Sequence, residues 1–124
     1  MRFIFIVLAV SLFLFGFGKT TMENEKSVYL IITANIKPEN SRELQSYLAD
    51  MAHVFDEHKG VPIGKYKTTK HIIGNKPQEL TAIIEFPNSS SINKMLKSSE
   101  YLALSHKRKI IFDELNIATC LKIE

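Results

Sequence analysis

The chain has 124 residues, of which 45% are hydrophobic and 23% charged, and its formal net charge is +3. This length and composition predict one globular domain and exclude a disordered chain. So small an excess of positive charge argues against nucleic acid or an anionic membrane as the main partner.

The first 18 residues predict export. Residues 3–17 are almost continuously apolar, Arg2 precedes them, and Gly18 offers a small residue for cleavage. This run is shorter than the roughly 20 residues that a membrane-spanning helix needs. We therefore expect a signal peptide and a secreted or periplasmic protein. Two alternatives stay open: an uncleaved membrane anchor formed by residues 3–17, and translation that starts at Met22.

The globular domain is predicted over residues 27–124, after a flexible polar lead-in over residues 19–26. Residues 27–36 alternate as a strand with one face for the core, formed by Val28, Leu30, Ile32, Ala34 and Ile36. Pro38 ends this strand and suits the first turn of a helix over residues 38–59. Apolar side chains recur in that helix at helical spacing, and Gly60 is the expected C-terminal stop.

The second half of the domain predicts two strands, a pair of short helices and a closing strand. Residues 61–73 form a polar strand whose lysines suit the edge of a sheet. Residues 74–77 form a turn, and residues 78–86 form the most apolar strand. Helices follow, one starting at an N-cap within residues 88–91 and one over residues 99–112, before a strand over residues 115–123. This is the β-α-β-β-α-β order of the split βαβ motif.

Such a sheet carries its helices on one side and leaves its other face open. The side chains predicted for that open face are too apolar to lie wholly in water: Tyr29, Ile31, Thr33, Ile83, Ala118 and Cys120. A second copy packed sheet against sheet in a two-fold homodimer would cover them.

Residues that could carry metal or nucleophilic chemistry are few. Cys120 is the only cysteine, so no internal disulfide forms, and we expect it to be a small buried strand residue rather than a nucleophile. His53 and His58 lie five residues apart, which does not place them on one face of a helix. The sequence contains no zinc-type Cys or His spacing, no glycine-rich phosphate loop and no Gly-x-Ser-x-Gly, and we expect neither metal nor cofactor.

Three short segments carry a family resemblance: His58-Lys59-Gly60, Glu85-Phe86-Pro87, and Ser99-Glu100-Tyr101 followed by Leu104 and Arg108. Through them the sequence from residue 27 onward resembles the DUF1330 family of the dimeric α+β barrel (ferredoxin-like) superfamily. Lys59 departs from the usual His-Gly-Gly of that family, and Ser99 departs from its usual proline. The resemblance implies an α+β fold, ferredoxin-like βαββαβ with an antiparallel sheet, and a homodimer. It implies no activity, because the family has none that is agreed.

The candidate site joins the apolar strand to the last helices. Tyr101 and Arg108, with Tyr47 from the long helix, are the candidate contacts to a small acidic or aromatic ligand, and Glu85 is a weak candidate for a general base. The alternative is structural: Arg108 pairs with Glu85 or Glu100 and fixes a helix to the sheet.

Three function classes stay open. We favour an exported dimeric protein, either structural or binding a small molecule, that has no catalytic activity. The superfamily resemblance implies the second class, a cofactor-independent monooxygenase or isomerase acting on a small apolar or aromatic acid in a site that excludes water. The third is an envelope interaction protein that uses its lysine-rich surface. The sequence identifies neither ligand nor substrate.

Overall fold

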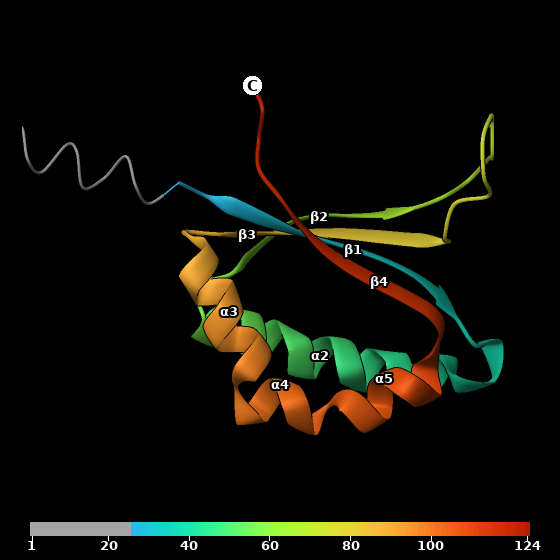
Figure 1. Ribbon diagram of the computed structural model, residues 1–124. Helices are drawn as coiled ribbons and strands as arrows, with labels where there is room; N and C mark the ends of the chain where they lie inside the picture. Colours follow the sequence, from blue (N-terminus) through green and yellow to red (C-terminus); the bar gives the residue numbers. More distant parts are fainter. Residues whose placement is uncertain (1–25) are drawn as a thin grey trace, which may run out of the picture.

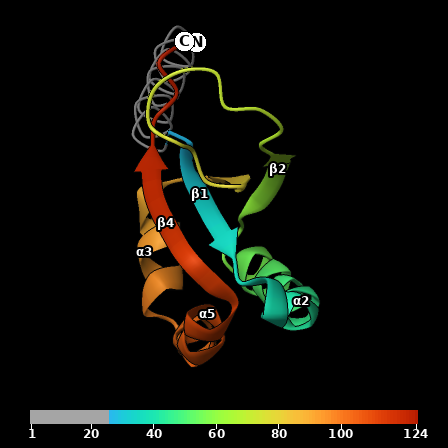
Figure 2. The ribbon, with the colours of Figure 1, turned by 90° about the vertical axis from the view of Figure 1, so that its right-hand side faces the viewer.

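The computed structural model describes residues 26–124, so the predictions of a signal peptide and of most of the lead-in lie outside the described residues. The elements are β1 (Val28–Ile36), the 3-10 turn η1 (Pro38–Asn40), α2 (Ser41–Glu57), β2 (Val61–Lys67), β3 (Leu80–Phe86), α3 (Ser89–Lys97), α4 (Ser99–Ala103), α5 (Ser105–Ile111) and β4 (Phe112–Cys120). The strands form one antiparallel sheet in the order β2-β3-β1-β4. All the helices lie against one face of it (Figures 1 and 2), which confirms the predicted ferredoxin-like α+β fold.

The core lies between this face and the helices, as the alternation in the strands predicts. Leu30, Ile84 and Phe86 of the two central strands are almost completely buried. The helices contribute the other buried side chains, among them Tyr47, Met51, Val54, Phe55, Ile92, Met95 and Ile111. The rings of Phe55 and Phe86 meet edge to face, with their centroids 6.2 Å apart. Within residues 26–124, no helix is both long and apolar enough to span a membrane.

The predicted start of the first short helix is confirmed. Asn88 is its N-cap, and the side-chain oxygen of Asn88 accepts a hydrogen bond from the backbone N–H of Ser91 at 2.9 Å. Ser98 caps α4 in the same way, through the N–H of Tyr101 at 3.2 Å. The predicted helix over residues 99–112 is therefore two short helices, α4 and α5, that meet at Leu104.

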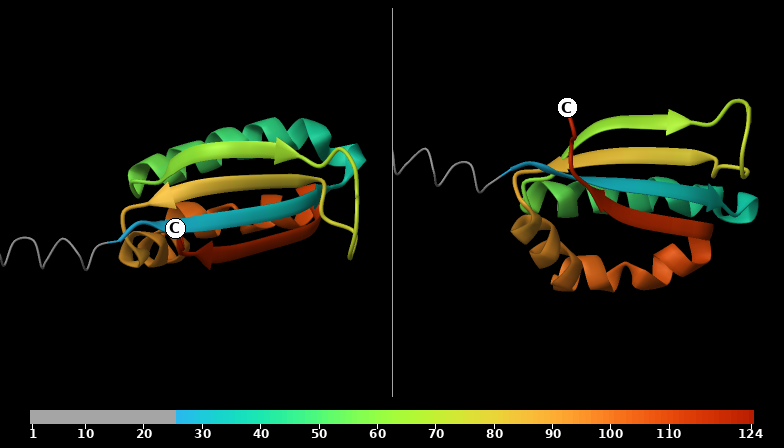
Figure 3. Two further views of the ribbon diagram at one scale, coloured as in Figure 1. Left: turned by 90° about the horizontal axis from the view of Figure 1, so that it is seen from above. Right: turned by 45° about the horizontal axis from the view of Figure 1, so that its top comes forward.

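The prediction of a strand over residues 61–73 is wrong beyond Lys67. Lys67 pairs with Leu80, the first residue of β3, so residues farther along the chain have no strand to pair with. The N–H of Thr68 donates to the carbonyl of Glu79 at 2.8 Å and closes a loop over residues 68–79. This loop extends past the end of the sheet (Figure 3).

The closing strand begins and ends earlier than predicted. Phe112 leaves α5 and pairs at once with Ile36, so β4 begins three residues before Leu115. It ends at Cys120, whose partner Tyr29 is the second residue of β1. Residues 121–124 lie beyond the strand, and Leu121 and Ile123 are exposed rather than part of an apolar strand face.

The end of α2 differs from the prediction in a way that involves the departure from the family motif. The left-handed residue is Lys59, with φ of 66°, and not Gly60. The N–H of Gly60 donates to the carbonyl of Phe55 at 2.7 Å, and the N–H of Lys59 donates to that of Asp56 at 3.2 Å, which is a Schellman motif. Gly60 is required for a different reason. A Cβ at this position would lie 2.6 Å from Cζ of the buried Phe86 ring.

We predict that Lys59→Gly stabilises the protein by about 1 kcal/mol, because glycine adopts a left-handed conformation without the steric cost that a lysine bears. Chemical denaturation followed by circular dichroism measures the change. The control is Lys70→Gly in the exposed loop, where φ is not positive and glycine only adds entropy to the unfolded chain. If Lys59→Gly stabilises no more than Lys70→Gly does, strain at Lys59 is not the cause.

Candidate functional site: a cavity between helix α2 and the sheet

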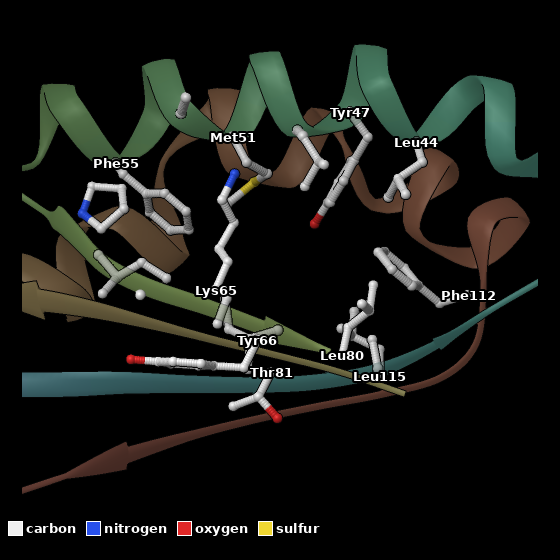
Figure 4. Close-up of a pocket in the computed structure, with 18 residues that line it drawn as sticks. Leu44, Tyr47, Met51, Phe55, Lys65, Tyr66, Leu80, Thr81, Phe112 and Leu115 are labelled. Atoms are coloured by element: carbon white, nitrogen blue, oxygen red, sulfur yellow. The ribbon is translucent and has the colours of Figure 1, made fainter. Parts of the chain in front are cut away.

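A cavity of about 340 Å³ lies between α2 and the sheet, and all four strands contribute to its lining. Figure 4 shows the side chains that surround it. Helix α2 supplies one wall with Leu44, Tyr47, Met51 and Phe55. The strands of the sheet form the opposite wall. Its side chains include Ile32, Leu80, Ala82, Ile84, Phe112 and Leu115.

The cavity exists because the sheet presents small or flexible side chains opposite α2. Ala82 of β3 and Ala34 of β1 face the helix, where their neighbours in the strands are leucine and isoleucine. Next to Ala82 in the sheet is Lys65 of β2. A register shift between Pro62 and Gly64 bends this edge strand. Large side chains on α2 therefore meet too little volume from the strands to close the interface.

Two polar groups face the cavity. The Tyr47 side chain projects from α2 into it, and the Lys65 side chain rises from β2 across its edge toward Met51 (Figure 4). Lys65 is the only charged residue of the lining, and its ammonium group makes no hydrogen bond or ion pair within the described chain. Tyr66 and Thr81 also border the cavity, but their side chains point to the other side of the sheet (Figure 4).

Behind the cavity wall, the structure brings together the three predicted ligand contacts. The Arg108 guanidinium lies 3.9 Å from the centre of the Tyr101 ring, and its Nη2 donates to the Tyr101 carbonyl at 2.9 Å. Nη1 of Arg108 is buried without a hydrogen-bond partner among residues 26–124. Of the three, only Tyr47 lines the cavity; Tyr101 and Arg108 do not.

The Tyr47 hydroxyl is poised to donate a hydrogen bond. Burial raises the pKa of the phenol above its ordinary value, and the positive charge of Arg108 offsets part of that rise. Near neutral pH the group is therefore protonated. In an apolar cavity, such a donor favours a ligand with an acceptor oxygen.

Glu85 lies on the opposite face of the sheet from the cavity. It alternates with the buried Ile84 and Phe86, so its side chain points away from the helices that carry Arg108. The Tyr29 hydroxyl donates to Oε2 of Glu85 at 3.4 Å. Loss of hydration raises the pKa of Tyr29, and the negative charge and hydrogen bond of Glu85 raise it further. The alternative of an ion pair between Arg108 and Glu85 or Glu100 is wrong, since neither pair forms in the described chain.

The remaining candidates do not form a metal or nucleophilic site. Within residues 26–124, no three His, Cys, Asp or Glu side chains lie close enough to hold a metal ion. His53 is exposed, and its Nε2 lies 3.7 Å from a carboxylate oxygen of Glu57. The prediction that Cys120 is buried is wrong for the single chain, because Cys120 ends β4 on the open face of the sheet and is exposed.

The residues that create the cavity were not among the predicted site residues. The sequence does contain an indication of the cavity. Ala34 and Ala82 are small residues at core-facing positions of strands whose other core-facing residues are larger, and Lys65 lies on the same face. A row of small side chains is visible as a cavity only when the register of three strands and the position of α2 are known.

The fold and the cavity define an α+β protein of the ferredoxin-like class with a mostly apolar site between helix and sheet. The match to known families agrees with this class. Residues 27–117 match the model of the family described as "Domain of unknown function (DUF1330)", and the chain belongs to this family. No curated protein sequence matches it.

Solved structures show the same fold at low sequence identity. A protein of unknown function from Rhodopseudomonas palustris is 14% identical, with a TM-score of 0.70 over 81% of this chain and 85% of that one. A DABB family protein with a ferredoxin-like fold from Mesorhizobium loti is 10% identical, with a TM-score of 0.60 over 79% and 98%. A protein from Bacteroides thetaiotaomicron assigned as an antibiotic biosynthesis monooxygenase is 12% identical, with a TM-score of 0.58 over 82% and 93%.

Proposed function

We propose that this protein is an exported homodimer that binds a small apolar acid in the cavity between α2 and the sheet. The observation that carries this proposal is the cavity itself. Its volume of about 340 Å³ is in the range of small-molecule sites, and its lining is apolar apart from a few polar groups.

The polar groups favour an acid over a neutral molecule. Lys65 provides an unpaired positive charge at the edge of the cavity, and the Tyr47 hydroxyl provides a donor inside it. A carboxylate that accepts a hydrogen bond from each would be held by charge-assisted contacts, while an aryl or alkyl group fills the apolar part. Arg108 supports this arrangement indirectly, through its position beside Tyr47.

Binding is favoured over catalysis by what lines the cavity. None of its described lining residues is Asp, Glu, His or Cys, so a carboxylate, imidazole or thiolate base is missing there, and Glu85 lies on the other face of the sheet. The alternative is a cofactor-independent monooxygenase or isomerase. It is supported by the likeness in fold to the Bacteroides thetaiotaomicron protein assigned as a monooxygenase. Such an enzyme would depend on the Tyr47 hydroxyl as its proton donor.

We predict that aryl or alkyl carboxylates raise the melting temperature and that the alcohols of the same skeleton raise it less. A ligand at one hundred times its Kd adds about 2.7 kcal/mol to the free energy of unfolding. Lys65→Gln should weaken carboxylate binding about tenfold, since one charge-assisted contact is lost. Lys67→Gln, outside the cavity lining, is the matched control.

A second variant tests the location of the site. Ala82→Phe places a ring in the cavity and should abolish the thermal shift, whereas Ala103→Phe on the exposed surface of α4 should leave it intact. Titration calorimetry measures both affinities. Tight binding that survives Ala82→Phe would contradict the assignment of the ligand to this cavity. Consumption of the ligand during the titration would favour the enzyme.

The homodimer is proposed from the open face of the sheet. The register places Tyr29, Ile31 and Ile83 on this face, and β2 adds the exposed Val61 and Tyr66. An apolar surface of this kind is uncommon on a monomer, and no described helix covers it (Figure 2). The likeness to the DABB family protein, whose fold is that of dimeric α+β barrels, supports the same arrangement.

We predict that the wild-type protein sediments as a dimer and that Ile83→Lys sediments as a monomer or aggregates. The new ammonium group would lie desolvated and unpaired in the middle of the contact, at a cost of several kcal/mol. Leu102→Lys introduces the same charge on the helical side of the molecule and should remain a dimer. A wild-type monomer at micromolar concentration in analytical ultracentrifugation would refute the sheet-to-sheet dimer.

Export is proposed from residues 1–18 alone. We predict that the protein isolated from its host lies outside the cytoplasm and begins near Lys19, because the apolar run is followed by small residues that suit cleavage. Intact-mass measurement of the native protein reads the first residue directly. A full-length species in the membrane fraction would instead identify an anchor, and a full-length cytosolic species would exclude both.

A further inference from the structure

Positive charge is concentrated in one segment of the domain. Residues 58–78 contain five lysines and no acidic residue: Lys59, Lys65, Lys67, Lys70 and Lys76. Residues 26–124 contain fourteen lysines and arginines and eleven acidic residues in all, so nine basic and eleven acidic residues lie outside this segment. The net positive charge of the described chain therefore belongs entirely to residues 58–78. The small net charge of the whole chain, which argues against an anionic membrane as the main partner, conceals this basic segment.

The loop over residues 68–79 projects beyond the end of the sheet (Figures 1 and 3), and we refer to it as the arm. Ile72 and Ile73 follow one another near its middle and are 83% and 89% exposed. Gly74, with φ of 89°, comes directly after them. No other part of the described chain packs against these two side chains, so the arm presents an apolar pair to solvent.

The arm combines the two features that favour an anionic membrane surface. Lys70 and Lys76 flank the apolar pair, and each lysine near a negatively charged leaflet strengthens binding about fivefold. The apolar pair gains by leaving water for the boundary between headgroups and acyl chains. Lysines alone would give a loosely held surface, and the isoleucines alone would give no preference for anionic lipid.

We propose that the arm docks this protein on an anionic lipid bilayer, with Ile72 and Ile73 inserted among the lipids and Lys70 and Lys76 in contact with headgroup phosphates. Charge complementarity selects this occupant over a second copy of the chain. A bilayer offers dense negative charge beside an apolar interior, whereas the surface of a second copy outside residues 58–78 has only two more acidic than basic residues. The arm also leaves the open sheet face free, since that face is formed by the paired strands.

A fluorescent reporter placed in the arm tests the proposal. The chain contains no tryptophan, so Ile73→Trp gives a single emission that reports on the arm rather than on the N-terminal segment. In the natively processed protein, we expect a blue shift of this emission on adding vesicles that contain phosphatidylglycerol, and no shift with pure phosphatidylcholine. High salt should reverse the shift, because screening weakens attraction to the surface. An emission that stays unchanged with anionic vesicles overturns the proposal.

Matched variants separate charge from apolar insertion. In vesicle co-sedimentation, Lys70→Gln with Lys76→Gln should weaken binding roughly thirtyfold, because each lysine contributes about fivefold. Lys94→Gln with Lys97→Gln removes the same charge from α3 and should leave binding nearly unchanged. Equal losses in the two pairs would overturn a specific role for the arm.

Removal of the apolar pair distinguishes a membrane from a second copy. Ile72→Ser with Ile73→Ser should abolish vesicle binding and leave the dimer intact in sedimentation. Leu102→Ser with Ile123→Ser, two exposed side chains elsewhere, is the control. If the arm variant instead becomes monomeric while vesicle binding was absent from the start, the arm belongs to the contact between copies and the proposal is wrong. Vesicle binding and sedimentation of these variants do not depend on whether a ligand binds in the cavity.

Discussion

The rest of the structure depends on the alternation of side chains along β1 and β3. Leu30, Ile84 and Phe86 point to one face of the sheet, and this single set of apolar side chains holds α2, α3 and α5 in place. Since the period of a strand is two, the same alternation places Tyr29, Ile31 and Ile83 on the other face. The core and the surface proposed for dimerisation are therefore two consequences of one pattern.

The cavity forms where the packing of α2 against the sheet is incomplete. A helix with large side chains covers a sheet evenly only where the strands supply matching volume. Ala34 and Ala82 do not supply it, and Lys65 of the edge strand cannot be buried without a partner. In a protein selected only for stability, larger apolar residues at these positions would fill the space. The small core residues, together with the exposed lysine at the edge of the cavity, are the basis of our proposal of a ligand.

The sequence allowed prediction of the fold, because long alternating strands and a helix of regular apolar spacing leave few topologies. Its predictions were wrong where pairing or packing between distant segments of the chain decides the structure. Ile72 and Ile73 continue the apolar content of a strand, but β3 begins too late to pair with them. Lys59, and not the expected Gly60, has the left-handed conformation. The chain turns before Gly60, which places Gly60 against Phe86. The predicted ligand contacts Tyr47, Tyr101 and Arg108 do lie together, but the cavity in front of them depends on strand register, which no local pattern shows.

Strand β2 links the two surfaces that we associate with function. It lies at the edge of the sheet, where among residues 26–124 it pairs with β3 alone. One part of it, with Pro62 and Lys65, forms a wall of the cavity, and its end leads directly into the arm. An edge strand with exposed isoleucine and tyrosine would invite pairing with other chains, and its lysines discourage this. If the arm rests on a lipid surface, the same lysines serve a second purpose. They orient the domain so that the strand bordering the cavity is held near the membrane, from which an apolar acid could enter.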